Sequence, residues 1–135
     1  MARIVLTNAV VKINSVDLSD HIANIELSQE FDDVETTAFG DSGRTRTGGL
    51  EDSSISLDFH QDFEAASVDA TISPLVGSTT SFEIIPNGTA VSATNPRYTG
   101  TCLITEWSPV SGAVGELATA SVTWPVSGSV TRAES

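Results

Sequence analysis

Alternation of apolar and polar residues runs through most of this 135-residue chain and constrains its fold more than any other feature. In the clearest stretch, Ile55, Leu57 and Phe59 are separated by polar side chains. A β-strand with one buried and one wet face produces this period of two. The alternation therefore predicts a mainly β protein, built as a single β-sandwich or barrel. Further strands are expected at residues 3–6, 10–13, 23–31, 81–85, 98–107 and 118–126.

The same pattern predicts which faces are buried. Ala23 and Phe31 share the apolar parity of their strand, and Ala118 shares that of Trp124, so each is expected to face the core. Residues 102–104 are all apolar, which is typical of a strand that is covered on both sides.

One segment departs from the period of two. Its apolar residues recur at helical spacing, which places them along one face of a helix. Asp62 can accept a backbone N–H bond at the helix start, and Pro74 disfavours helical geometry at Ser73. We therefore expect one flanking α-helix over residues 62–73. The apolar stripe consists of Ala65, Val68, Ile72 and Leu75.

The length is that of one domain, so residues 1–135 are interpreted as a single domain in which residues 131–135 form a loose tail. Cys102 is the only cysteine and cannot form an internal disulfide, which favours a reducing compartment. The apolar N-terminal stretch is too short for a signal peptide, and no run approaches the ~20 apolar residues of a membrane span. We expect a soluble protein, made in the cytosol, with no membrane insertion.

The acidic residues are concentrated in one part of the chain. The net charge is −12, and between Asp17 and Asp69 fourteen Asp or Glu face only Arg44 and Arg46. Phosphate binding depends on Lys and Arg, so this charge is of the wrong sign for wrapping nucleic acid. It suits a surface that nucleic acid passes without binding, and it equally suits solubility alone.

A long polar segment separates two of the predicted strands. Residues 36–52 hold four glycines and show no strand of clear period through their centre. Loops longer than ~12–15 residues are uncommon in compact domains and are usually functional or disordered. We interpret this segment as a long inter-strand loop that reaches outside the domain and contacts a partner. The alternative is a flexible, solvated loop.

Residues 40–43 of this loop spell GDSG, which surrounds the nucleophilic serine of chymotrypsin-like proteases. Such an enzyme needs two β-barrels, a histidine beside Ser42 and a buried carboxylate beside that histidine. His60 is expected to be solvated, and His21 to be half-buried at a strand edge. The motif is therefore interpreted as part of a loop in which Ser42 is not a nucleophile, and the protein is expected not to be an enzyme.

Other chemical sites are poorly supported. Cys102 is distant in sequence from both histidines, so no metal site of Cys and His type is indicated. The acidic residues Glu30, Asp32, Asp33 and Glu35 could hold calcium loosely, but they lack the glycine and spacing of an EF-hand loop. The better interpretation is that these carboxylates lie at a solvent-exposed strand end, where they repel one another. We expect no metal and no cofactor.

Asn87 and Gly88 signal a turn. Trp107 and Trp124 could form a platform on which a sugar stacks, but Trp124 has the buried parity of its strand. Core packing is the better interpretation there, whereas Trp107 lies at the end of its predicted strand and is less constrained.

Residues 36–63, TTAFGDSGRTRTGGLEDSSISLDFHQDF, resemble the signature region of tail tube (major tail) proteins of long-tailed bacteriophages. In that family a strand leads into a loop with a Phe-Gly-Asp-like element, one or two basic residues and a Gly-Leu pair, and an alternating strand follows. A helix, a strand ending in Pro-Asn-Gly, a Tyr-x-Gly strand and the stretch ATASVTWPVSGSV agree as well. The resemblance covers about residues 11–132.

The resemblance implies a β-sandwich with one helix and six subunits per ring, with the rings stacked into a hollow tube through which DNA passes during ejection. Its partners would be other copies of itself, the tape-measure protein, the tail terminator and tail tip proteins, and the passing DNA without specific binding. It would be located in the virion tail and assembled in the host bacterial cytoplasm. The loop would contact a neighbouring subunit or the next ring. The candidate contact residues are Phe39, Asp41, Arg44, Arg46, Leu50 and Asp52.

Two alternatives stay open. The protein could be another tail structural protein, namely a terminator, a tip component or the tube of a gene transfer agent. Terminators and tip proteins usually cap a tube and do not polymerise. It could instead be a carbohydrate-binding or adhesion β-sandwich, which would need exposed aromatic side chains.

Overall fold

The computed structural model describes residue 3 and residues 5–134. Within them the chain is mainly β, every strand pairing is antiparallel, and one short α-helix is present, as predicted. The strands are β1 (Val10–Ile13), β2 (Val16–Asp17), β3 (Ile22–Ser28), β4 (Phe31–Glu35), β5 (Arg46–Glu51), β6 (Ser54–His60), β7 (Thr79–Ile85), β8 (Arg97–Leu103), β9 (Thr119–Pro125) and β10 (Thr131–Ala133). The helical elements are η1 (Ser19–His21), α1 (Val68–Ile72) and η2 (Ser73–Leu75).

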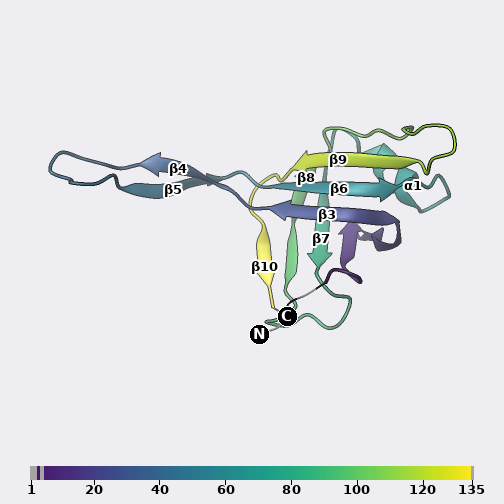
Figure 1. Ribbon diagram of the computed structural model, residues 1–135, viewed down its shortest axis with the longest axis horizontal. Helices are drawn as coiled ribbons and strands as arrows, with labels where there is room; N and C mark the ends of the chain where they lie inside the picture. The colour runs from purple at the N-terminus through teal and green to yellow at the C-terminus, as the bar shows by residue number, and fades with distance from the viewer. Residues whose placement is uncertain (1–2, 4, 135) are drawn as a thin grey trace.

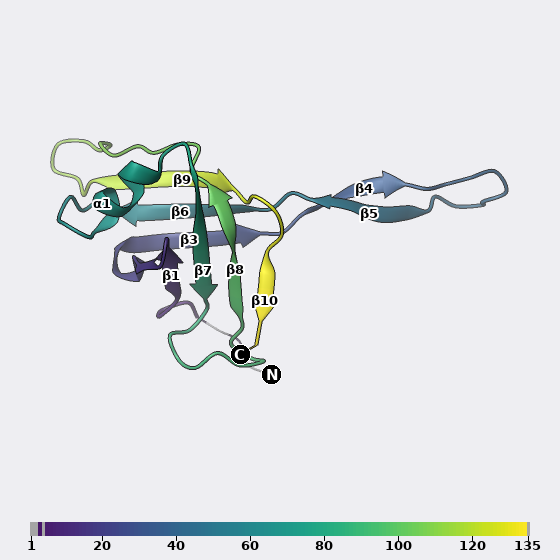
Figure 2. The same cartoon turned by 180° about the vertical axis from the view of Figure 1, so that it is seen from behind.

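Two open sheets form a sandwich. One has the strand order β10-β8-β7-β1-β2 and the other the order β3-β6-β9. In Figures 1 and 2 the strands of the first sheet run across the direction of those of the second. Such crossed packing lets two twisted sheets share one core. The sheets do not close into a barrel, so the sandwich is the correct form of the prediction.

The core lies between the sheets and is built from alternating residues. Leu57 on β6 pairs with Val122 on β9, and both side chains are buried. The Phe59 ring meets the Trp107 ring edge-on at a centroid distance of 5.7 Å, and Trp124 is fully buried. The alternation predicted for β6 and β9 is therefore confirmed. The first sheet adds Val11, Ile13, Phe82, Ile84 and Cys102.

Three expectations about buried residues were wrong. Ala23 is exposed because an irregularity in register between Ile22 and Asn24 breaks the alternation at the start of β3. Phe31 begins β4 and is 60% exposed. Ala118 precedes β9 and is exposed as well.

The ends of the chain also differ from prediction. Arg3, Val5 and Leu6 lie outside any strand, and the remaining residue of the predicted strand at 3–6 lies outside the described residues. Residues 131–133, expected to be part of a loose tail, form β10 and pair with β8. The strand predicted at 98–107 ends at 103.

The helix is shorter than the predicted span of 62–73. Asp62 does accept a backbone N–H bond, from Glu64 at 2.9 Å, but this bond closes a turn before the helix. Ala66 then adopts a positive φ of 61°, which interrupts helical geometry. Ser73 stays helical, contrary to expectation, since Pro74 lies in the first turn of η2, where its missing N–H costs nothing. Of the predicted stripe, Val68 and Ile72 are buried, Leu75 is half-buried and Ala65 is exposed.

Candidate functional site

A two-stranded hairpin projects from the sandwich (Figure 1). It consists of residues 31–51, and we call it the arm. The prediction of a loop without strands over residues 36–52 was wrong, because β4 and β5 pair along it and only residues 36–45 connect them. The expected reach outside the domain is confirmed, since nearly all of the arm is exposed. Neither face of the arm rests on a core, which explains why no period of two marks it.

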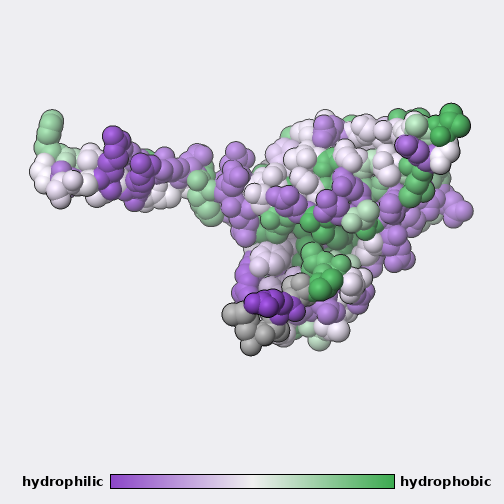
Figure 3. All heavy atoms as spheres, viewed as in Figure 1, coloured by the Kyte–Doolittle hydropathy of each residue, from purple (hydrophilic) through white to green (hydrophobic). Residues whose placement is uncertain are grey.

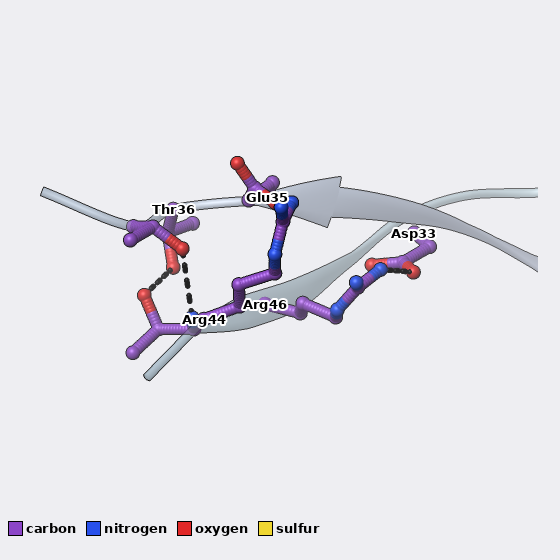
Figure 4. Close-up of polar contacts among 7 residues, drawn as sticks. Asp33, Glu35, Thr36, Arg44 and Arg46 are labelled. Carbon is purple, nitrogen blue, oxygen red and sulfur yellow. Dashed lines mark hydrogen bonds and ion pairs between the residues drawn. The ribbon is translucent and has the colours of Figure 1, made fainter. Parts of the chain in front are cut away.

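Two ion pairs cross the arm (Figure 4). Arg44 Nη1 lies 2.8 Å from Glu35 Oε1, and the Arg46 guanidinium pairs with the Asp33 carboxylate. All four side chains are about half exposed or more, so each pair adds at most ~1 kcal/mol of stability. The two arginines that were expected to contact a partner are thus paired within their own chain. These pairs also engage two of the four carboxylates that were considered for calcium.

The tip of the arm is an ordered turn. The Asp41 N–H donates to the Ala38 carbonyl at 3.2 Å, and the Ala38 N–H donates to Asp41 Oδ2 at 2.8 Å. Gly40 adopts φ of 96°, which glycine tolerates without strain at the third position of such a turn. Phe39 at the second position is fully exposed. The Phe-Gly-Asp sequence therefore forms a turn that exposes the Phe39 ring to solvent.

Hydroxyl groups join the two strands behind this turn. Thr36 Oγ1 and Thr45 Oγ1 lie 2.8 Å apart, and the Thr45 N–H donates to Thr37 Oγ1 at 2.9 Å. Together with the bond from the Thr36 N–H to the Thr45 carbonyl, they order the connection between β4 and β5.

The root of the arm is fixed to the sandwich. Glu51 Oε2 accepts hydrogen bonds from the Ser53 hydroxyl at 2.7 Å and from the Val130 N–H at 3.0 Å. These bonds, the Ser53 bond foremost, lower the pKa of Glu51. The Asp52 N–H donates to the Glu30 carbonyl at 2.7 Å, so the chain enters and leaves the arm through a paired neck. The sequence carried no signal for this role of Glu51.

Three apolar side chains of the arm are largely exposed. Phe39 and Leu50 are 109% and 80% exposed, and Phe31 is 60% exposed. Figure 3 shows the arm as a mostly hydrophilic surface with hydrophobic atoms at its far end and near its root. Exposed apolar groups on a projecting element are candidate contact residues. Asp52, by contrast, is an exposed charge at the neck.

Ser42 has no catalytic surroundings. It lies in the connection at the tip of the arm, whereas His21 is half-buried in the sandwich and bonds through Nε2 to Asp62 Oδ2 at 2.9 Å. The pKa of Asp62 is lowered mainly by the Glu64 N–H, with His21 contributing less. His60 is half-buried at the end of β6, rather than solvated as expected.

Cys102 and the tryptophans are packing residues. Burial raises the pKa of the Cys102 thiol to about 11, which keeps it protonated and poorly reactive. The Trp107 indole N–H donates to Asp69 Oδ1 at 3.1 Å, and the Trp124 indole N–H donates to the Glu106 carbonyl at 2.9 Å. Both rings contribute to the core around Phe59, so they form no exposed platform for a sugar.

In the part of the chain that the structure describes, no group of three or more His, Cys, Asp or Glu is arranged to hold a metal ion. In the same residues, no helix has the length and apolar character needed to cross a membrane.

Neither models of known protein families nor curated protein sequences match this chain. Solved structures share its fold. A chain in the structure described as "Virion of native gene transfer agent (GTA) particle" matches with a TM-score of 0.74 and 15% identity, over 93% of this chain and 95% of that chain. A chain in "Tail of empty GTA particle computed with helical refinement, C6 symmetry" matches with a TM-score of 0.61 and 16% identity, over 82% and 81%.

A third chain, in "Cryo-EM structure of the anti-feeding prophage (AFP) baseplate, 6-fold symmetrised", matches with a TM-score of 0.53 and 8% identity, over 98% and 97% of the two chains. The fold is thus one that chains in these particles also adopt, over 82% to 98% of this chain. This confirms the fold implied by the resemblance to tail tube proteins.

Proposed function

We propose that this protein is a structural subunit of the tail of a phage or phage-like particle, and that it polymerises as stacked hexameric rings into a hollow tube for DNA. The observation that carries the proposal is the arm. It is an ordered element that projects from the sandwich and exposes the apolar side chains of Phe39 and Leu50. The fold shared with chains of assembled particles, one of them a tail with C6 symmetry, supports the same conclusion.

The sheet β3-β6-β9 supplies a surface suited to the wall of such a tube. Its outward side chains are mainly hydroxyls and acids, together with Asn24, His60 and Pro125, and neither Lys nor Arg is among them. Ser56 and Thr123, for example, lie side by side with their hydroxyl oxygens 3.1 Å apart. A wall of this kind gives phosphate groups neither Lys nor Arg to bind, so DNA would slide past it. This sheet face is our candidate for the lumen.

The arm would supply contacts between subunits through Phe39 and Leu50, with Asp52 at its neck. Asp41, Arg44 and Arg46 would act indirectly, because their charges order the arm. Rings of identical subunits with such head-to-tail contacts close when the rotation between subunits divides a full turn. Other tail components, such as a tape-measure protein, a terminator and a tip complex, would then meet the ends and the interior of the tube.

A tip or baseplate component is the second candidate function, because a chain of a 6-fold prophage baseplate shares the fold over nearly its whole length. Such a subunit forms a ring but no long polymer. Electron microscopy of the purified protein, concentrated and stained, separates the two. Tubes support the tail tube, isolated rings support a tip component, and a persistent monomer at high concentration would contradict self-assembly.

A further inference from the structure

The two edges of the sheet β3-β6-β9 differ in how they are protected. On β9, the Thr123 N–H donates to Glu106 Oε1 at 3.0 Å and the Thr119 N–H donates to the Ser111 carbonyl at 3.4 Å. Pro125 has no N–H to offer. The segment before β9 therefore covers that edge and leaves little for another strand to pair with.

The β3 edge has no such cover from the same segment. The Thr123 N–H points away from β6, so Thr123 and its cross-strand partner Ser56 form a pair without backbone hydrogen bonds between them. The backbone N–H and C=O groups of Ser56 therefore point the other way, toward Glu26 on β3. Adjacent residues of a strand direct their backbone N–H and C=O groups to opposite sides of that strand. Ile25 and Leu27 therefore direct their backbone N–H and C=O groups toward the free edge.

A hollow of about 280 Å³ runs along this same edge. We call it the β3 groove. It is lined by Ile25, Leu27 and Gln29 on the β3 side, by Ile84, Pro86 and Tyr98 on the side of the other sheet, and by Leu6 and Ala9 of the segment before β1. Its walls are mostly apolar. An unpaired strand edge beside apolar pockets is the arrangement by which proteins accept an added strand.

The charge of the groove indicates its occupant. The described residues that line it include no Asp, Glu, Lys or Arg, although the chain as a whole carries a net charge of −12. A second copy of this chain is equally acidic, and like charges brought together in an interface are costly. An uncharged, apolar groove is the kind of surface on which another acidic copy can dock without that cost.

We propose that the β3 groove receives the arm of a second copy, with Phe39 seated among the apolar side chains and a strand of the arm lying along β3. This inference rests on the proposed function and adds the acceptor for the arm. The arm cannot fill the groove of its own chain, because it runs away from the sandwich (Figures 1 and 2). If each copy gives its arm to one neighbour and its groove to another, the contact is head-to-tail and links copies into a closed ring or an open filament.

Disulfide trapping between two variants tests this contact. Phe39→Cys is prepared unlabelled and Gln29→Cys is prepared with heavy nitrogen, so that mass spectrometry identifies bonds between different copies. Gln29 is exposed at the rim of the groove. Native Cys102 can remain, since it is buried with a raised pKa. The matched control replaces Gln29→Cys by Val114→Cys, which is fully exposed in the segment before β9.

We expect the mixed disulfide between positions 39 and 29 to exceed that between 39 and 114 by at least about tenfold at equal concentration. Equal yields, or no disulfide, would overturn the inference. If tubes form but the 39–29 disulfide does not, the proposed function stands and only the assignment of the β3 groove as acceptor of the arm is refuted. A strong 39–29 disulfide in a protein that forms no rings or tubes would support the contact and count against the proposed function.

Discussion

Val34 on β4 and Gly49 on β5 lie diagonally across the arm, so closely that a β-carbon on Gly49 would lie 2.9 Å from Val34 Cγ2. The same β-carbon would lie 2.9 Å from the Cβ of Asp32. Real side chains do not approach each other this closely, and a β-carbon has no freedom to move aside. Glycine at this position is therefore a condition for the pairing of β4 with β5.

Gly49→Ala should disorder the arm and leave the sandwich folded. Gly48→Ala is the matched control, because nothing lies within 4 Å of its β-carbon. Hydrogen exchange of the amides in residues 31–51 would rise by about tenfold or more in the first variant and stay unchanged in the second. Assembly should fail only in the first. Equal protection in both variants would show that the strands adjust around the methyl group.

Replacing residues 36–45 by Asn-Gly should shorten the arm without unfolding it. Asn-Gly favours the tight turn of a two-residue hairpin, and Glu35 and Arg46 are already cross-strand partners. We expect an unchanged melting temperature and a loss of assembly, measured by calorimetry and electron microscopy. Normal tubes from this variant would show that the tip, Phe39 included, takes no part in assembly.

Val122→Asp should unfold the protein. Val122 is 4% exposed and faces the core from β9, so an aspartate there would bury an unpaired charge. The expected loss of stability exceeds ~3 kcal/mol, which chemical denaturation would detect. Thr119→Asp, on the outward face of the same strand and opposite His60, should change stability by less than ~0.5 kcal/mol. Similar effects of the two substitutions would contradict the assignment of faces.

The Glu51 carboxylate should make the neck of the arm sensitive to acid. Its pKa lies below the ordinary value of 4.5, because the Ser53 hydroxyl and then the Val130 N–H stabilise the charged form. A group with a lowered pKa in the fold contributes stability above its unfolded pKa and loses that contribution as the pH falls through the lowered value. Glu51→Gln should lower the melting temperature at pH 7 and flatten its decline below pH 4.5. Asp52→Asn, at an exposed neighbour, should leave that decline intact.

Glu106→Ala should expose the edge of β9. The carboxylate of Glu106 receives the Thr123 N–H at 3.0 Å, and without it an unpaired donor faces solvent. Unprotected strand edges promote irregular pairing between chains. Light scattering should therefore show aggregation of this variant. The control is Glu116→Ala, which removes an exposed carboxylate from the same segment and should show no aggregation at the same concentration. Comparable solutions of the two variants would mean that other groups protect the edge.

The sequence predicted those parts of the fold in which burial imposes a pattern. Leu57 and Val122 were placed correctly because strands with one buried face must alternate. Ala23 was misplaced because it lies at an irregularity in register that interrupts the alternation, and composition does not record it. The helix start was misplaced because Asp62 and Ala66 form a separate turn before α1.

The arm was predicted as a projection but not as a hairpin. Its strands bury neither face, so apolar residues need not recur at every second position. The pairing of Arg46 with Asp33 depends on the register of β4 and β5, which no local pattern fixes. The turn that presents Phe39 had a readable signal, because glycine followed by aspartate within a polar segment is typical of turns. The β3 groove joins residues far apart in the chain and could not be found before the fold was known.

The neck of the arm has a mechanical consequence. β4 follows β3 after two residues, and β5 leads into β6 after two residues, so a pull on the arm is transmitted along the backbones of β3 and β6. These strands are registered with each other from Ser28 and Ser54 to Ile22 and Phe59, and β6 is also registered with β9. Tension along the arm would pull β3 and β6 in the same direction, so it would load the hydrogen bonds between β6 and β9 together, rather than opening them singly from one end. A connection anchored in this way can sustain axial force, which a chain of subunits joined end to end must do whenever it bends.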